Sequence, residues 1–198
     1  MTATEVSLGW DESSVPLHTH ACYYYSDEQT LRRSLEFVRA GLDVPEDLCV
    51  IFSDSSRFAQ LKGWLQDSYS GTVKGLEASG KLAMIGGAPT TEALVAQIGG
   101  RLDEGIRAGY KLIRFLGFIA WGEPGWPDDR TLLEFESTVN AVVMAYPAVI
   151  ICTYGVPTLG GNRLVYGGLQ THPIVWLGGQ EVRDNPFFVP PARVETSK

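Results

Sequence analysis

Short apolar runs alternate with amphipathic segments along most of the chain. Runs rich in strand-forming residues, typical of strands covered on both faces, predict strands at residues 21–25, 48–52, 81–85, 111–118, 148–154 and 173–177. Between them, apolar positions recur every three or four residues, as on one face of a helix, over 27–40, 55–68, 91–108 and 129–145. Such alternation predicts an α/β domain of three layers, with helices on both sides of a mostly parallel central sheet.

The first predicted helix carries signals at both of its ends. Ser26, followed three residues later by Gln29, predicts a capping box, and Gly41 predicts the C-terminal end. The flanks of the chain are more polar. We expect residues 1–17 to form a flexible arm, residues 18–190 one domain, and residues 191–198 a C-terminal tail.

Composition and charge narrow the classes of function. The net charge of −7 and a pI near 5.0 argue against a nucleic-acid partner, because no basic stripe is present to contact phosphates. The chain has three cysteines, an odd number that suits a reducing cytoplasm better than a disulfide scaffold. No signal peptide is visible, and no apolar run approaches the ~18 residues that span a membrane. We therefore expect a cytoplasmic protein without a membrane partner.

Residues 75–81, Gly-Leu-Glu-Ala-Ser-Gly-Lys, fit the first seven positions of the phosphate-binding loop G-x-x-x-x-G-K-[ST]. The context is wrong, because such a loop joins a buried strand to a helix, whereas a strand follows Lys81 here. Leu82 also replaces the hydroxyl residue that would bind Mg²⁺. We expect the end of a helix, a turn and a strand, with no binding of ATP or GTP and no dependence of activity on Lys81.

Several stretches share motifs with a known sensory family. They are His20-x-x-Tyr23/Tyr24 before a helix that ends in Phe37-x-x-Ala-Gly-Leu42, the segment from Arg114 to Trp121, Phe135-Glu136-x-x-x-Asn140, and Cys152-x-Tyr154. Together they resemble the MEDS domain, the sensory module of methanogen and methylotroph regulators. The resemblance covers roughly residues 18–190. It implies a RecA/KaiC-like core without a functional phosphate loop, and a role in sensing small hydrocarbon-like or one-carbon compounds.

Candidate ligand-binding residues lie on two predicted strands and just before a third. By the two-residue period of a strand, His18, His20, Cys22 and Tyr24 share one face. Cys152 and Tyr154 share a face at the C-terminal end of their strand, where open α/β sheets bind ligands. We expect an apolar pocket there, with a rim formed by His20, Cys22, Trp121, Cys152, Tyr154 and His172.

These residues leave two chemical alternatives open. His20, Cys22, Cys152 and His172 could form a Cys₂His₂ metal set, although their spacing fits no standard zinc pattern. A cysteine nucleophile with a histidine partner is the other alternative. We expect no metal ion, no cofactor and no catalytic residue.

Polar residues inside otherwise apolar segments complete the candidate site. Glu136 and Asn140 lie one helical turn apart on one face. A buried charge needs a partner, and Arg114 is the predicted partner of Glu136. Two roles are open for these residues. Arg114 and Glu136 could form a structural ion pair beside Asn140, or the three side chains could contact the ligand.

The sequence thus predicts a non-catalytic sensory domain for a small apolar or one-carbon-type ligand. No output region is visible, so the signal is expected to pass to a separate protein, such as a kinase or an anti-sigma-type regulator. A protein-interaction scaffold is the first alternative, and a metal-dependent or thiol enzyme is the second. The formation of a homo-oligomer is left open.

Overall fold

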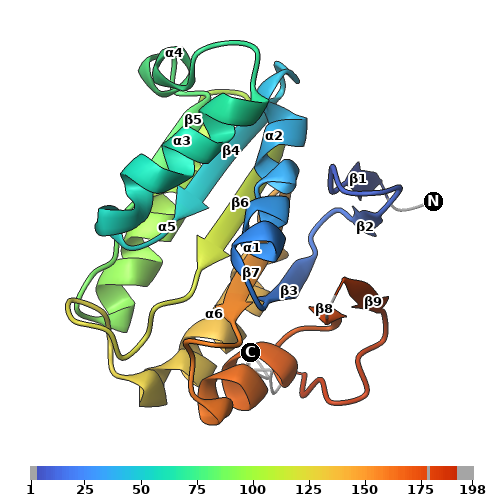
Figure 1. Ribbon diagram of the computed structural model, residues 1–198, viewed down its shortest axis with the longest axis vertical. Coiled ribbons are helices and arrows are strands. Elements are labelled where there is room, and N and C mark those ends of the chain that lie inside the picture. Colours follow the sequence, from blue (N-terminus) through green and yellow to red (C-terminus); the bar gives the residue numbers. More distant parts are fainter. Residues whose placement is uncertain (1–3, 178, 191–198) are drawn as a thin grey trace, which may run out of the picture.

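A seven-stranded sheet forms the centre of the molecule in the computed structural model, which describes residues 4–177 and 179–190 (Figure 1). The strand order is β5-β4-β6-β7-β3-β8-β9, and all neighbours are parallel except β8 and β9. The strands are β3 (His20–Tyr25), β4 (Asp47–Phe52), β5 (Leu82–Ile85), β6 (Leu112–Phe118), β7 (Ala148–Gly155), β8 (Ile174–Leu177) and β9 (Gln180–Val182).

Helices cover both faces of this sheet. They are α1 (Glu28–Ser34), α2 (Glu36–Leu42), α3 (Phe58–Ser68), α4 (Val73–Ala78), α5 (Thr91–Arg107), α6 (Leu132–Val143), the 3₁₀ turns η1 (Ser55–Arg57) and η2 (Asp129–Thr131), and the π-helix η3 (Arg163–Leu169). The core of one face includes side chains from α5 and α6, and the core of the other includes side chains from α1 to α4. The prediction of a three-layer α/β fold with a mostly parallel sheet is confirmed.

The first predicted helix is divided into two. Its N-cap is Asp27, whose Oδ1 accepts from the Thr30 amide at 2.8 Å, while Thr30 Oγ1 accepts from the Asp27 amide at 3.1 Å. The capping box is therefore one residue later than the predicted pair of Ser26 and Gln29. Gly41 lies inside α2, where an added Cβ would meet Arg114 Cδ at 2.5 Å. This glycine permits close packing and does not end the helix.

The N-terminal segment differs from the predicted flexible arm. Strands β1 (Glu5–Ser7) and β2 (Ser14–Pro16) pair as an antiparallel hairpin. Its Trp10 is buried and packs against Tyr23 and Trp176, with ring centroids 5.3 and 5.8 Å apart. The packing of Trp10 in the core holds the hairpin against β3 and β8, on the face of the sheet that α1 to α4 cover. The predicted tail at 191–198 lies outside the described residues.

The segment that fits the phosphate-loop pattern is a helix followed by a turn, as predicted. Gly75 lies in α4, and Gly80 reverses the chain with a φ of +75° before β5. The buried Lys81 ammonium donates to the backbone carbonyls of Val44 and Asp47. Lys81 thus donates to carbonyls beside the N-terminal end of β4. A phosphate-binding lysine would instead lie near the N-terminus of a helix.

Arg114 forms a buried ion pair with Asp47, not with Glu136. Arg114 Nε donates to Asp47 Oδ2 at 2.7 Å, and both side chains are 6% exposed. The guanidinium also donates to the Ser7 carbonyl at 2.6 Å and lies over the ring of Phe37. These contacts lie on the face covered by α2, whereas Glu136 belongs to α6 on the other face. The predicted pair of Arg114 and Glu136 is therefore wrong.

Replacing Asp47 with alanine is expected to lower the free energy of unfolding by about 3–5 kcal/mol, because it leaves a buried guanidinium without its anion. Urea denaturation measures this change. The neighbouring Glu46 pairs with Lys111 on the surface, so Glu46→Ala should cost less than about 1 kcal/mol. Equal losses in the two variants would contradict the structural role assigned to Asp47.

Candidate functional site

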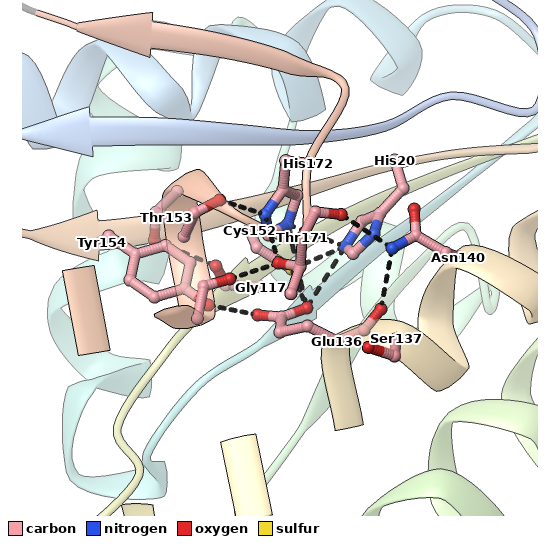
Figure 2. A network of polar contacts seen from close by, with 12 residues as sticks. His20, Gly117, Glu136, Ser137, Asn140, Cys152, Thr153, Tyr154, Thr171 and His172 are labelled. Carbon is pink, nitrogen blue, oxygen red and sulfur yellow. Dashed lines mark hydrogen bonds and ion pairs between the residues drawn. The ribbon is translucent and has the colours of Figure 1, made fainter. Parts of the chain in front are cut away.

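The register between β3 and β7 places the predicted residues on one face of the sheet. Cys22 pairs with Cys152 and Tyr24 with Tyr154. Because alternate residues of a strand share a face, His20 lies on that face as well. The helix α6 covers it, and Glu136 points from α6 toward the two strands (Figure 2).

Five polar side chains meet beneath α6, and we call them the Glu136 cluster: Glu136, His20, Cys152, Tyr154 and His172. Each is at most 3% exposed. Glu136 Oε2 lies 3.3 Å from His20 Nε2, 3.5 Å from Cys152 Sγ and 3.8 Å from His172 Nε2. The Tyr154 hydroxyl donates to Glu136 Oε1 at 2.5 Å. The two imidazoles touch, with their Nε2 atoms 3.0 Å apart, and His20 Nε2 lies 3.3 Å from Cys152 Sγ.

The imidazole of His172 is oriented by the π-helix. Its Nδ1 lies 2.7 Å from the carbonyl of Gly168 and 2.9 Å from Thr171 Oγ1, whose own proton goes to the Gly167 carbonyl. Since a carbonyl only accepts, Nδ1 carries the proton. In the neutral ring, Nε2 then presents a lone pair to His20 and Glu136.

Amide side chains hold the backbone around the cluster. Asn140 Nδ2 donates to the carbonyls of Thr171 at 2.7 Å and Glu136 at 3.2 Å. Asn185 Nδ2 donates to the His172 carbonyl at 2.9 Å. Asn140 was predicted as a site residue, whereas Asn185 and Thr171 were not. Their types and spacing carry no signal, because only the tertiary fold brings them to His172.

Burial governs the protonation of the cluster. Desolvation lowers the pKa of His20 to about 3, and the nearby Asn140 side chain opposes this effect. Desolvation and the neighbouring His20 lower the pKa of His172 to about 3. Desolvation raises the pKa of Glu136, and together with Glu136 it raises the pKa of Cys152. Both imidazoles are thus neutral at pH 7, and Cys152 lacks the lowered pKa of a thiol nucleophile.

The remaining predicted residues lie outside the cluster. Tyr24 donates from its hydroxyl to the Leu164 carbonyl of η3. Cys22 is buried beside Cys152 and is not among the four residues whose ligand atoms converge. Trp121 packs against Phe135, with ring centroids 4.5 Å apart. Arg114 lies on the opposite face of the sheet, as described above.

Side chains fill the region where the sequence predicted an apolar pocket. His20, Cys22, Trp121, Cys152, Tyr154 and His172 are all buried. A void of about 10 Å³ lies beside Cys152 and Gly117, which is barely enough for one water molecule. The predicted residues therefore form a packed core around a polar centre.

A much larger hollow, which we call the α6 groove, adjoins the cluster next to His20 and Asn140. It has a volume of about 1230 Å³ and lies between α6, the first residues of β3 and β8, and the segment 183–190. His20 and Asn140 line both the groove and the cluster. The lining also includes apolar side chains from β2, from α6 and the residue after it, from the start of β8 and the residue before it, and from the segment 183–190: Pro16, Ala141, Val143, Met144, Pro173, Ile174, Phe188 and Pro190.

The cluster also has the composition of a metal site. His20, Glu136, Cys152 and His172 each offer one ligand atom, and these four atoms lie within 4.8 Å of one another. Compared with the Cys₂His₂ set left open as an alternative from the sequence, Glu136 takes the place of Cys22.

The strand order and the helices on both faces define the class of RecA-like α/β domains. A KaiC-like protein from the hyperthermophilic archaeon Pyrococcus horikoshii OT3 has a similar structure, with a TM-score of 0.66 over 88% of this chain and 80% of that chain. At 16% sequence identity, the likeness shows the fold alone. The chain itself belongs to the MEDS family, the methanogen/methylotroph, DcmR sensory domain, which matches residues 19–173. No curated protein matches the chain.

The position where a RecA-like fold would hold nucleotide phosphates carries acids in this chain. At the junction of β3 and α1, the Asp27 carboxylate already accepts from the Thr30 amide, and Glu28 follows it. A phosphate there would displace the cap and face two carboxylates, without a lysine to compensate.

We therefore expect no binding of ATP or GTP with Mg²⁺ at sub-millimolar concentration, as measured by isothermal titration calorimetry. Lys81→Ala should not alter this result, since Lys81 contacts backbone carbonyls. Micromolar affinity for ATP that disappears in Lys81→Ala would overturn both the prediction and the structural assignment of Lys81.

Proposed function

We propose that this chain is a non-catalytic sensory domain that binds a small apolar or one-carbon compound in the α6 groove. Membership of a sensory family supports the general role. The observation that carries the proposal is the shared wall of groove and cluster. His20 and Asn140 both border the groove and both contact the buried network. His20 is only 1% exposed, whereas Asn140 is half-buried. A ligand in the groove would therefore touch Asn140, which donates to the carbonyls of Glu136 and Thr171.

The lining of the α6 groove suits such a ligand. Small-molecule sites are mostly apolar, with a few polar groups that fix orientation. Here Met144, Pro173, Ile174 and Phe188 supply apolar surface. The polar lining includes Thr138 and Asn140 and the charged side chains of Glu134, Arg183 and Asp184. This position differs from the one predicted from the sequence, because it lies at the N-terminal ends of β3 and β8.

The signal would pass to a separate protein. Because α6 forms one wall of the groove and also carries Glu136, a ligand that shifts α6 would alter the exposed surface of this helix. A kinase or an anti-sigma-type regulator is the class of partner that we propose. We place this exchange in the cytoplasm, in agreement with three cysteines that are all free. Among the helices of the described residues, none is both long and apolar enough to cross a membrane.

Thermal unfolding with a panel of halomethanes, methanol, methylamine and short hydrocarbons tests the groove. At ~100 times its Kd, a binding compound stabilises the native state by about 2.7 kcal/mol, or ~5–10 °C in Tm. Ala141→Trp should abolish this shift, because Ala141 is an exposed residue that lines the groove. Ala108→Trp, at an exposed alanine outside the groove, should retain it. An unchanged Tm with every compound, or equal responses of the two variants, would reject the proposal.

Two further measurements separate the alternatives. Gas chromatography of the same compounds after incubation with the protein should show no consumption, whereas an enzyme would convert at least one of them. If the chain is only an interaction scaffold, a partner captured from the host would bind wild type and Ala141→Trp equally, with or without ligand. A sensory domain predicts that the ligand changes capture by the wild type alone.

A further inference from the structure

The four ligand atoms of the Glu136 cluster all lie within 4.8 Å of one another, and several of their separations match those around one tetrahedral ion. At zinc bond lengths of about 2.0–2.3 Å, neighbouring ligand atoms of a tetrahedral site lie roughly 3.3–3.6 Å apart. In the cluster, His20 Nε2 lies 3.0 Å from His172 Nε2, 3.3 Å from Cys152 Sγ and 3.3 Å from Glu136 Oε2. The contacts of Glu136 Oε2 with Cys152 Sγ and His172 Nε2 are 3.5 and 3.8 Å.

We propose that His20, Glu136, Cys152 and His172 bind a divalent transition-metal ion, for which Zn²⁺ is the best match. This inference does not depend on the proposed sensory function. It replaces the expectation from the sequence that the chain binds no metal. Imidazole nitrogen, thiolate sulfur and carboxylate oxygen are the three ligand types that Zn²⁺ accepts.

The proton position on His172 suits a cation at this centre. His172 Nε2 presents a lone pair, since its Nδ1 donates to the Gly168 carbonyl. A metal ion also requires a lone pair on His20 Nε2, which the neutral ring has when its proton lies on Nδ1. Two lone pairs 3.0 Å apart repel each other unless a proton or a cation lies between them. A metal ion coordinates both.

Charge balance gives the same answer. A thiolate, a carboxylate, two neutral imidazoles and a divalent ion sum to zero, which suits a fully buried centre. Binding would release the proton of the Cys152 thiol to solvent, together with that of Glu136 where the carboxyl is protonated. Four metal–ligand bonds form in place of the hydrogen bonds among these atoms, and no other covalent bond breaks.

The surrounding contacts resemble those that orient metal ligands. A ligating imidazole usually donates its second nitrogen to a carbonyl, as His172 does toward Gly168. The free oxygen of Glu136 accepts from Tyr154 at 2.5 Å. With four protein ligands, each at most 3% exposed, the ion would connect β3, β7, α6 and the segment before β8 as a structural site, without an open position for catalysis.

Metal content and cobalt spectroscopy of the full chain test the proposal in the wild type. Protein purified without chelator should contain about one equivalent of metal by mass spectrometry, and removing it should lower Tm. After reconstitution with Co²⁺, visible bands of a tetrahedral site and a near-ultraviolet thiolate-to-cobalt band should appear. A wild-type chain with less than about 0.1 equivalent of metal and no cobalt spectrum overturns the inference.

Matched cysteine variants identify the ligand set. Cys152→Ser should remove the thiolate-to-cobalt band and reduce retained metal at least tenfold. Cys22→Ser changes a buried thiol on the same sheet face and should keep both. His172→Ala should also lose the metal, with circular dichroism as the check on folding. If Cys22→Ser and Cys152→Ser lose the cobalt band alike, the assigned ligands are wrong.

The outcomes are distinct from those of the groove experiment. A chain without metal that still responds to a groove compound would reject the metal site and leave the sensory proposal intact. A chain that contains metal but responds to no compound would support the metal site and reject the sensory proposal.

Discussion

A carboxyl group held away from water in an apolar core is the constraint on which the arrangement around α6 depends. Glu136 has no exposed surface, and burying such a group without partners costs several kcal/mol. Its partners come from β3, from β7 and from His172 in the segment just before β8. Satisfying this one side chain therefore fixes the distance and rotation of α6 over the sheet. The walls of the α6 groove follow from the same placement.

The parts of the fold that could be predicted are those whose own residues carry a clear period. The buried strands and the helix α5 (Thr91–Arg107) are of this kind. The hairpin of β1 and β2 was missed although Val6, Leu8 and Trp10 alternate as in a half-buried strand, because the two strands are only three residues long each. Trp10 is buried only because Tyr23 and Trp176 lie opposite it in the folded chain. The break after Ser34 was likewise invisible, since both halves of that helix keep the same apolar face.

The candidate site was predictable to the extent that it depends on strand alternation. The two-residue period placed His20 and Cys22 on one face, and the register with β7 brings Cys152 beside them. The partner of Glu136 could not be predicted, because the pattern of a helix does not reveal which side of the sheet it covers. Arg114 in β6 points toward α2 and meets Asp47, whose charge lies at the edge of an apolar run.

The two ends of the parallel strands differ in the ligands that they can bind. Open α/β sheets usually bind ligands at the carboxyl ends of their strands, yet the end of β3 leads into a helix already capped by Asp27. The large groove lies at the opposite edge, beside the first residues of β3 and β8. A ligand at that edge needs neither the helix N-terminus nor its dipole. The absence of a phosphate loop from this junction is therefore compatible with a binding site elsewhere. Contact with Asn140, which donates to the carbonyls of Glu136 and Thr171, would link such a site to the buried core.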